Sequence, residues 1–183
     1  MKLFIASDLH GDFECARKMT DAYAASGAEK LILLGDLLYH GPRNDLPPQY
    51  APKDVISLLS SLAKDIICVR GNCDTEVDAM VLPFPILSEY SYILADGIAI
   101  FAAHGHKYGE DNPPPLGEKD VLLTGHTHVP AAKKLADGGY YVNPGSVSLP
   151  KAGSKKSYIL YDNGVFRFFE LEGSEYMTFS PEK

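Results

Sequence analysis

Metal-binding side chains recur in five short clusters along the sequence, and each cluster directly follows an apolar run. Two clusters are histidine pairs with i, i+2 spacing, and the other three carry carboxylate, imidazole or amide groups. The clusters are Asp8-Leu9-His10, Gly35-Asp36, Gly71-Asn72, His104-Gly105-His106 and His126-Thr127-His128. Mixed oxygen and nitrogen ligands of this kind suit Mn, Fe, Co, Ni or Zn. The sequence therefore predicts a site for divalent metal ions.

Each cluster alone has an ordinary structural explanation. The segment from Asp8 to His10 is typical of a turn with a helix cap, and Gly-Asp and Gly-Asn are common turn dipeptides. The ordered combination is far more specific, because polar groups that converge at the ends of several strands mark a functional site. We therefore predict one shared site rather than five separate turns.

The elements that would position these clusters alternate between strands and helices in the first half of the chain. Residues 2–7, 30–34 and 66–69 are predicted strands, and each runs into a polar cluster. Residues 13–26 and 55–63 have helical spacing, and the first of these helices is predicted to stop at Gly27. Helical crossovers imply parallel, right-handed pairing, which brings the polar clusters to one edge of a sheet.

The second half of the chain is predicted to be rich in short strands. These are residues 92–94, 98–103, 121–124, 140–142, 157–161 and 165–171. The turn signal Asn163-Gly164 predicts a hairpin between the last two. The proline-rich segments 39–52 and 112–115 are predicted loops, and the first of them borders the expected site.

Composition limits the classes of function. The chain of 183 residues, 45% of them hydrophobic, is long enough to bury a core, and we expect one domain over residues 1–183. With 24 acidic and 17 basic residues the net charge is −7, which opposes nonspecific binding to nucleic acid. A small phosphorylated substrate is compatible with this charge, because bound divalent cations reverse the sign of the field locally.

Cysteine content and hydropathy indicate a soluble, cytoplasmic protein. The cysteines Cys15, Cys68 and Cys73 are odd in number and lack the spacing of a disulfide framework, which favours a reducing compartment. The apolar run at residues 3–6 is too short for the core of a signal peptide. No stretch approaches the roughly 20 apolar residues that span a bilayer.

The ordered clusters resemble the successive motifs of the calcineurin-like metallophosphoesterases. These are Asp8-x-His10, Gly35-Asp36, Gly71-Asn72-Cys73-Asp74, His104-Gly105-His106 and Gly125-His126-Thr127-His128. The sequence more closely resembles the small bacterial and archaeal phosphodiesterases of the YfcE type, through His40-Gly41-Pro42-Arg43-Asn44 and Asn143-Pro144-Gly145-Ser146. The resemblance covers nearly the whole chain. It implies a four-layer α/β/β/α sandwich with two divalent metal ions at the strand ends, Mn²⁺ being expected and Zn²⁺, Fe, Co²⁺ or Ni²⁺ the alternatives.

The resemblance also implies a role for each ligand. One metal would be held by Asp8, His10 and His128, the other by Asn72, His104 and His126, and Asp36 would bridge both. A bridging carboxylate holds the ions roughly 3.5–4 Å apart, so that they share one hydroxide. That hydroxide would attack the phosphorus of a phosphodiester directly, without a covalent phosphoenzyme. The catalytic residues implied are Asp36, Asn72, Cys73 and His104.

Cys73 stands where many members of that family have a histidine that resembles a general acid or a phosphate clamp. A thiol is not a cationic hydrogen-bond donor, so substrates with poor leaving groups should suffer most. We therefore expect preference for phosphodiesters with good leaving groups and weak action on phosphomonoesters. A nucleophilic role for Cys73 is disfavoured, because no cysteine-phosphatase loop surrounds it.

Four further side chains have roles that the sequence leaves open. His40 and Arg43, in the proline-rich loop, are candidate substrate contacts, with surface exposure as the alternative, and Cys73 is a third candidate. His106 would either support the metal ligands or be structural. Asp74 would orient Cys73 or a water, or cap a following helix, and capping is favoured.

Two other functions compete with the phosphodiesterase. The retromer subunit is similar in fold but acts in protein assembly, and degraded ligands would favour such a scaffold, whereas every position here holds a competent ligand. A phosphomonoesterase or protein phosphatase would use the same metals. The expected partner is a small phosphodiester, and residues 81–86 are a candidate contact in a homo-oligomer, with covering of the core as the alternative.

Overall fold

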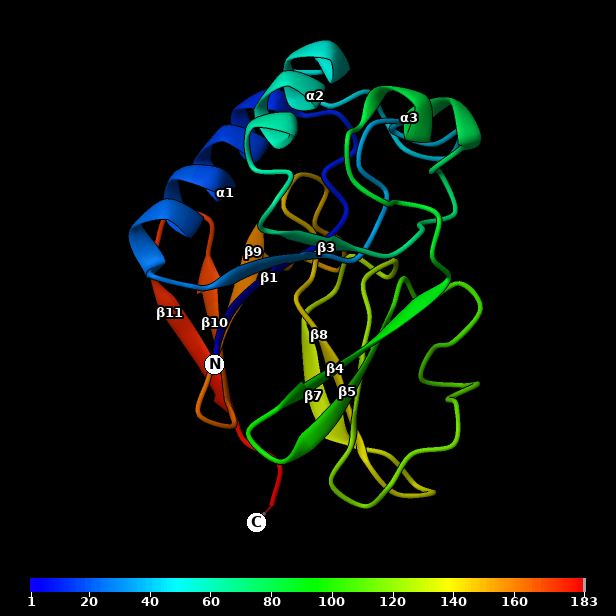
Figure 1. Ribbon diagram of the computed structural model, residues 1–183, viewed down its shortest axis with the longest axis vertical. Coiled ribbons are helices and arrows are strands. Elements are labelled where there is room, and N and C mark those ends of the chain that lie inside the picture. Colours follow the sequence, from blue (N-terminus) through cyan, green and yellow to red (C-terminus); the bar gives the residue numbers. More distant parts are fainter. Residues whose placement is uncertain (183) are drawn as a thin grey trace.

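Two β-sheets pack face to face to form the centre of the protein (Figure 1). The computed structural model describes residues 1–182. The strands are β1 (Lys2–Ala6), β2 (Lys30–Leu33), β3 (Ile66–Cys68), β4 (Tyr90–Ala95), β5 (Ile98–Ala103), β6 (Val121–Leu123), β7 (Ala131–Lys134), β8 (Tyr140–Asn143), β9 (Ser157–Asp162), β10 (Val165–Glu170) and β11 (Glu175–Phe179). The helices are α1 (Phe13–Ser26), α2 (Pro52–Ser61) and α3 (Glu76–Val81).

The strand order explains how distant segments of the chain meet. The first sheet has the order β11-β10-β9-β1-β2-β3, and the second has the order β4-β5-β6-β8-β7. β1, β2 and β3 pair in parallel, as do β5, β6 and β8. Each parallel set therefore presents its carboxyl ends at one edge, and the alternation of strands and helices predicted this for β1, β2 and β3.

Alternating side chains of β1 separate two layers of the core. Phe4 and Ala6 point toward α1 and α2, which lie side by side over this sheet in Figure 1. Leu3 and Ile5 point the other way and pack against the second sheet. Because both faces of β1 are buried, the strand reads as a continuous apolar run rather than as an alternating one.

The outer face of the second sheet is covered by irregular chain. Phe101, Leu122 and Tyr141 on this face pack with Tyr108 and Leu116 from the segment between β5 and β6. Within residues 1–182 every helix precedes β4, so this layer is a loop. The fold is the predicted α/β sandwich of two sheets flanked by helices, and a loop covers the outer face of the second sheet.

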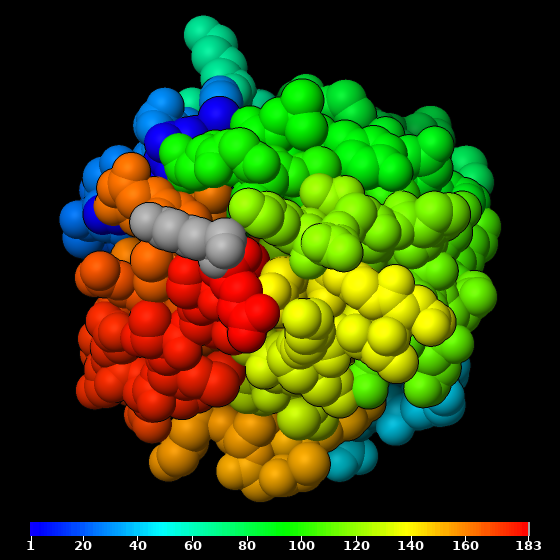
Figure 2. Space-filling view, turned by 90° about the horizontal axis from the view of Figure 1, so that it is seen from below, coloured from blue at the N-terminus to red at the C-terminus, as the bar shows by residue number. Residues whose placement is uncertain are grey.

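The C-terminal segment joins the two sheets at the end of the molecule seen in Figure 2, where it lies (red) against the segment of β7 and β8 (yellow). The ring of Phe179 packs 5.6 Å from that of Tyr140, measured between centroids. The N–H of Glu182 donates to the Tyr140 hydroxyl over 3.1 Å. These contacts attach the edge of the first sheet to the second.

Three elements, α3, β7 and β11, were not predicted. α3 has six residues and buries none of them, so it leaves no amphipathic pattern in the sequence. β7 has the sequence AAKK, and only its backbone pairing with β8 identifies it as a strand. β11 is a largely exposed edge. Within the described residues, no helix combines the length and the apolar character that crossing a membrane requires.

Candidate metal centre

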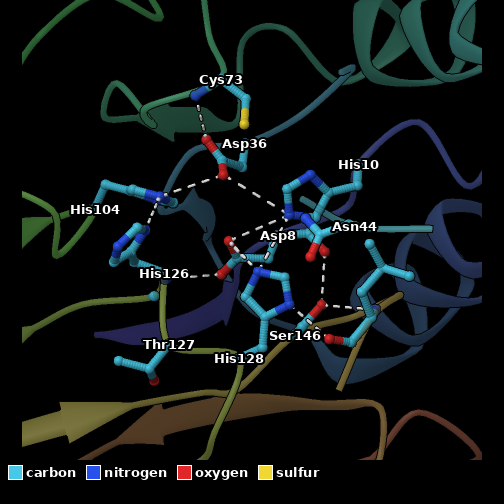
Figure 3. Close-up of polar contacts among 12 residues, drawn as sticks. Asp8, His10, Asp36, Asn44, Cys73, His104, His126, Thr127, His128 and Ser146 are labelled. Carbon is cyan, nitrogen blue, oxygen red and sulfur yellow. Dashed lines mark hydrogen bonds and ion pairs between the residues drawn. The ribbon is translucent and has the colours of Figure 1, made fainter. Parts of the chain in front are cut away.

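The predicted metal ligands gather where the parallel strands of both sheets end (Figure 3). Each lies shortly after a strand, because the buried strand fixes the backbone and the loop then turns into the site. Asp8 and His10 follow β1, Asp36 follows β2, Asn72 follows β3, His104 follows β5, and His126 and His128 follow β6. The structure thus brings all of these residues together from both sheets.

Five of the predicted ligands have a left-handed backbone. The φ angles are 58° at Asp8, 49° at His10, 55° at Asp36, 66° at His126 and 60° at His128. For a residue with a Cβ atom this conformation costs roughly 1–2 kcal/mol. Such strain persists only where surrounding contacts impose it, and its concentration at one place is typical of a functional site.

Asp74 holds two of the ligand loops together. Its buried carboxylate accepts hydrogen bonds from the N–H groups of Asp36 (2.9 Å), Leu37 (2.9 Å) and Gly71 (2.7 Å). The favoured prediction that Asp74 caps a helix is wrong, because Thr75 caps α3 with its own capping box. Asp74 lies one residue before that cap and instead satisfies the buried N–H groups of the tight turns beside it.

Glycine is required where the backbone approaches two of the ligand carboxylates. A Cβ atom on Gly71 would overlap the carboxylate of Asp36. A Cβ atom on Gly125 would overlap Ser7 Oγ and lie 2.7 Å from Asp8 Oδ2. Gly71 therefore lets two loops of the first sheet meet closely, and Gly125 lets a loop of the second sheet approach a loop of the first.

The segment after β8 supports the ligand loops from the second sheet. The hydroxyls of Ser146 and Ser148 both donate to the carbonyl of Asp8, over 2.8 Å and 2.9 Å. The Asn143 amide donates to the carbonyl of Gly125 over 2.7 Å. The motif from Asn143 to Ser146 thus positions the ligand loops, and its own side chains bind their backbone. Ser148 was missed because a Ser-x-Ser spacing carries no specific signal.

Three buried imidazoles direct the same nitrogen toward the centre of the cluster. The Nδ1 atoms of His10, His104 and His128 lie 2.8 Å, 2.7 Å and 2.6 Å from backbone carbonyl oxygens of Tyr39, Leu34 and Leu149. A carbonyl oxygen only accepts, so each Nδ1 must donate. In the neutral ring this leaves the lone pair on Nε2, and a hydrogen bond of this kind fixes the tautomer of metal-binding histidines.

The first donor set consists of Asp8, His10 and His128. The two Nε2 atoms face each other at 3.2 Å, and Asp8 Oδ1 lies 3.6 Å from that of His10 and 3.3 Å from that of His128 (Figure 3). Asp8 Oδ1 is buried and makes no hydrogen bond within residues 1–182. Lone pairs and a carboxylate oxygen repel at such distances unless a proton or a cation lies among them, so this set fits a cation.

The second donor set surrounds His104. Its Nε2 lies 3.1 Å from Asn72 Oδ1, 3.2 Å from His126 Nδ1 and 3.4 Å from Asp36 Oδ2. Asp36 Oδ2 also lies 3.7 Å from His10 Nε2, so this carboxylate stands between the two sets. Imidazole, amide and carboxylate donors in these positions suit a second divalent cation that shares Asp36.

The charges of the cluster shift the pKa values of its members in opposite directions. Burial opposes the charged form of Asp8, but the adjacent histidines outweigh it and hold the pKa of Asp8 well below its usual range. Burial also opposes the charged form of His104, but the carboxylates of Asp36 and Asp8 raise its pKa to about 9. Burial and the charge of His104 lower the pKa of His126 to about 4. A proton on His104 therefore competes with any cation for the same nitrogen.

A cavity opens above the ligands and has a basic rim. It is lined by Gly41, Pro42, Arg43 and Asn44 from the loop after β2, by Asn72 and Cys73, by Lys151, and by Asp36, His126 and His128. Arg43 is thus at the mouth of the site, where a substrate contact was predicted. Lys151 was not predicted, because nothing in its local sequence separates it from the other lysines.

His40 and His106 occupy different positions around the site. The ring of His40 packs edge-on between Tyr39 and Tyr50, at centroid distances of 4.8 Å and 5.4 Å, and is not among the residues that line the mouth. His106 is exposed and lies 5.4 Å from the ring of His104. His106 lines two further cavities beside the ligands, so it borders the site rather than supporting it from within.

Cys73 lies against the carboxylate of Asp36. Its N–H donates to Asp36 Oδ1 over 2.8 Å, and its Sγ accepts from the Asn72 amide over 3.3 Å. Burial, together with the charge of Asp36, raises the pKa of the Cys73 thiol to about 12. The thiol is therefore neutral near pH 7, which agrees with the prediction against a cysteine nucleophile.

Known phosphoesterases are similar to this chain over most of its length. The model of the calcineurin-like phosphoesterase superfamily domain matches residues 1–164. Phosphodiesterase YfcE of Escherichia coli K12 is 46% identical over 171 residues, which are 93% of this chain and 92% of YfcE. The solved structure of the E. coli phosphoesterase Yfce has a TM-score of 0.95 and 43% identity over the whole of both chains. Vacuolar protein sorting 29 from Cryptosporidium parvum, at 17% identity and a TM-score of 0.63 over 98% of this chain and 97% of that protein, shares the fold alone.

Proposed function

Because this chain belongs to the calcineurin-like phosphoesterase superfamily, we propose that it is a metal-dependent hydrolase of phosphodiesters. The observation that carries the proposal is the convergence of three buried imidazoles, each with Nε2 directed inward, on two buried carboxylates. Burying this many lone pairs and charges is unfavourable without cations to bind them.

Asp8, His10 and His128 are assigned to one cation, Asn72, His104 and His126 to the other, and Asp36 to both. Two divalent cations at these ligands would supply an activated water as the nucleophile and positive charge for the phosphoryl oxygens. Mn²⁺ is the metal we propose, and the same donors suit Zn²⁺, Fe, Co²⁺ or Ni²⁺. The reaction is direct hydrolysis, because the neutral thiol of Cys73 is a poor nucleophile.

The residues at the mouth orient the phosphate. Arg43 presents a planar guanidinium and Lys151 an ammonium to the non-bridging oxygens, and both attract the negative charge of a diester. The Asn44 amide, held by a 2.7 Å hydrogen bond to the carbonyl of His40, adds a neutral donor at the same rim. These side chains exclude water and align the phosphorus with the ligands beneath it.

Cys73 determines which leaving groups the enzyme accepts. Its thiol lies beside the bridging carboxylate but has a pKa of about 12, so it transfers a proton to a departing alkoxide poorly near pH 7. Phosphodiesters with acidic leaving groups need no such proton. We therefore propose that these are the preferred substrates and that phosphomonoesters react weakly.

The test is a metal-reconstituted assay of wild type, Cys73→His and Asp36→Asn on an aryl phosphodiester and the matched aryl phosphomonoester. We expect turnover of the diester by wild type only with added Mn²⁺ or another transition metal, and a loss of more than about 100-fold in Asp36→Asn. Cys73→His should raise monoester turnover relative to diester turnover. Equal, strong turnover of both esters by wild type would contradict the assigned preference and favour the phosphomonoesterase.

A scaffold of the retromer-subunit type predicts a different result. It would show no metal-dependent turnover of either ester, whatever its metal content. The complete ligand set favours the enzyme over the scaffold. We also propose a cytoplasmic location, which the three free cysteines support.

A further inference from the structure

A polar cavity, here called the side cavity, lies beside the candidate metal centre. It has a volume of about 310 Å³ and is lined by Arg70, Gly71 and Asn72 from the turn after β3, by Glu89, and by His106 and Lys107 from the loop after β5. Asn72 also lines the mouth of the site, so the two cavities share a wall. Because Asn72 belongs to the second donor set, the side cavity begins next to the place where a phosphate would lie.

The direction of in-line attack decides which part of a phosphodiester the side cavity can receive. The nucleophile assigned above is an activated water between the two donor sets, so the leaving oxygen points away from Asp36 and out through the mouth. The other three oxygens on phosphorus then point sideways. One of them carries the second ester group, which the reaction does not displace. The side cavity lies where this retained group would extend from the phosphate past Asn72.

Arg70 is held in a fixed position at the wall of the side cavity. Its backbone N–H donates to the carbonyl of Ser88 over 2.8 Å, and its Nε donates to the carbonyl of Asp74 over 3.2 Å. Its Nη2 lies 3.6 Å from the carboxylate of Glu76, whose side chain is 76% exposed, so this ion pair is weak. Nη1 makes no hydrogen bond or ion pair within residues 1–182. The guanidinium is therefore preorganised and keeps donors for a further anion.

Lys107 supplies a second cation to the side cavity, and Glu89 supplies a carboxylate. The two side chains form an ion pair and are 53% and 47% exposed. The pKa of Glu89 is lowered mainly by Lys107 and to a smaller extent by His106 and Arg70, so these side chains surround one carboxylate. Because an exposed ion pair is weak, a bound anion can replace Glu89 as the partner of Lys107.

A neighbouring cavity lacks a fixed guanidinium. It shares His106 and Lys107 with the side cavity, but its other charged side chains are the carboxylates of Glu110 and Asp111. Lys133, which is outside that lining, pairs with Glu110 over 2.6 Å, so the carboxylate of Asp111 is the charge that remains. An anion is therefore better bound in the side cavity than in its neighbour.

We propose, on the basis of the hydrolase proposed above, that the side cavity binds the retained ester group of the phosphodiester. Its two cationic side chains select for a retained group that carries an anionic end group. Arg70 donates to this anion through its planar fork, and Lys107 donates through its ammonium. The mouth thus binds the phosphate, and the side cavity determines which diesters are preferred.

The test uses three diesters that all release para-nitrophenol and differ only in the retained group. This group is carboxypropyl, its uncharged isostere carbamoylpropyl, or the cationic trimethylammonioethyl. With Mn²⁺ added, wild type should have a kcat/KM for the carboxypropyl ester at least about 5-fold above that for the carbamoylpropyl ester. The trimethylammonioethyl ester should have the lowest value. The difference should lie in KM, because the leaving group is the same in all three.

Variants assign this preference to the side cavity. Lys107→Gln and Arg70→Gln should each reduce the preference for the carboxypropyl ester, and Glu89→Gln should increase it, because it leaves both cations without their carboxylate. The control is Lys64→Gln, which removes the same charge from an exposed position before β3, at the other end of the strand from Arg70. It should leave the preference unchanged.

Calorimetry adds a measurement that does not depend on turnover. Carboxypropyl phosphate should bind to wild type more tightly than carbamoylpropyl phosphate, and the two should bind about equally to Lys107→Gln. Turnover of the diesters without preference for the carboxylate, or a preference that survives in both Lys107→Gln and Arg70→Gln, overturns the side cavity as the binding site and leaves the hydrolase intact. Preference for the trimethylammonioethyl ester overturns the anionic class. Absence of turnover of all three esters contradicts the hydrolase itself, and equal binding of the two phosphates to wild type then overturns the side cavity separately.

Discussion

Asp74 acts on the candidate site through three backbone N–H groups rather than through a substrate. In Asp74→Asn the amide has one acceptor oxygen instead of two, and its NH₂ group faces N–H donors. A buried N–H group left without an acceptor costs about 1–3 kcal/mol. We expect urea denaturation to show a loss of about 2 kcal/mol in the free energy of unfolding, and metal titration to show affinity about 10–100-fold weaker.

Asp78→Asn is the matched control for this prediction. Asp78 belongs to the capping box of α3, which is exposed, so its loss should cost about 1 kcal/mol or less and leave metal affinity unchanged. Unchanged metal affinity in Asp74→Asn would show that the hydrogen bonds to Asp36 and Gly71 do not position the ligands.

His104 should make the stability of the metal-free protein depend on pH. Its pKa is raised from 6.5 to about 9 in the folded state, so the folded state binds the proton more tightly than the unfolded state. The stabilisation is complete below pH 6.5 and is lost as the pH rises through about 9. At about 1.4 kcal/mol per pH unit it amounts to about 3 kcal/mol.

The measurement is thermal unfolding with a chelator at pH 6.5 and pH 9.5. The melting temperature of wild type should decrease when the pH is raised from 6.5 to 9.5, and this decrease should be smaller in His104→Asn. A smaller decrease should remain in the variant, because the pKa of His10 is also raised: burial lowers it, but the carboxylate of Asp8 raises it by more. An equal decrease in melting temperature in wild type and in His104→Asn would show that His104 is not the group that binds the proton.

At the residue scale, sequence reasoning reached the ligands but missed Lys151 at the mouth and Ser148 beside Asp8. Asp8, Asp36 and His104 follow predicted strands, and this adjacency survives folding because a buried strand fixes its own carboxyl end. Lys151 and Ser148 reach the site only through the path of the loop after β8. Their local sequence has no feature that predicts this placement.

Among the connecting elements, the turn after β3 should tolerate no side chain at Gly71. In Gly71→Ala the new Cβ atom would occupy the position of the Asp36 carboxylate and displace it. We expect metal binding and diester turnover to fall by more than about 100-fold, while circular dichroism shows the sheets intact. Gly117→Ala is the control, because its Cβ atom would meet only the side chain of Asp120.

A Gly71→Ala variant that binds metal like wild type would mean that the loop after β2 can retreat from the loop after β3. The N–H of Gly71 is bound to Asp74, which also binds the N–H of Asp36. Movement of the loop after β2 would therefore relieve the overlap with the new Cβ atom but would break one of these hydrogen bonds to Asp74.

At the element scale, the strands and helices that form the core were predicted and the peripheral ones were not. Predicted and observed bounds of α1 agree, because Asp12 caps its start and Gly27 ends it. α2 begins at Pro52, three residues before the predicted start, since proline is well suited to the first turn of a helix. α3 and β7 depend on a capping box and on backbone pairing, which hydrophobic periodicity does not detect.

For the whole molecule, bound cations should act as a cross-link between the two sheets. Asp8, Asp36 and Asn72 come from the first sheet, and His104, His126 and His128 come from the second. A ligand that binds only the folded state at 1,000 times its dissociation constant adds about 4 kcal/mol to the free energy of unfolding. For a chain of this size that corresponds to a rise in melting temperature on the order of 10 °C.

Thermal unfolding of the chelated protein with and without Mn²⁺ measures this rise. Asp36→Asn, which alters the carboxylate between the two donor sets, should reduce it. An equal rise in wild type and in Asp36→Asn would mean that the cation binds elsewhere on the chain.

The fold class was predictable at this scale from the family resemblance, and consecutive crossovers predicted the parallel pairing and hand of the first three strands. The hairpin at Asn163-Gly164 is also confirmed, as the turn between β9 and β10. The loop layer over the second sheet was not predictable, since Tyr108 and Leu116 lie in a segment without periodicity. The single domain over residues 1–183 stays a prediction.

The left-handed backbone at five ligand positions has an evolutionary consequence. In a lineage that abandons catalysis, selection no longer keeps histidine or aspartate at positions 8, 10, 36, 126 and 128, and glycine there would relieve roughly 1–2 kcal/mol of strain at each. Divergence toward a scaffold would therefore be favoured by stability as well as permitted by loss of function. Glycine at these positions in a descendant of this fold would therefore indicate that its ancestors had bound metal.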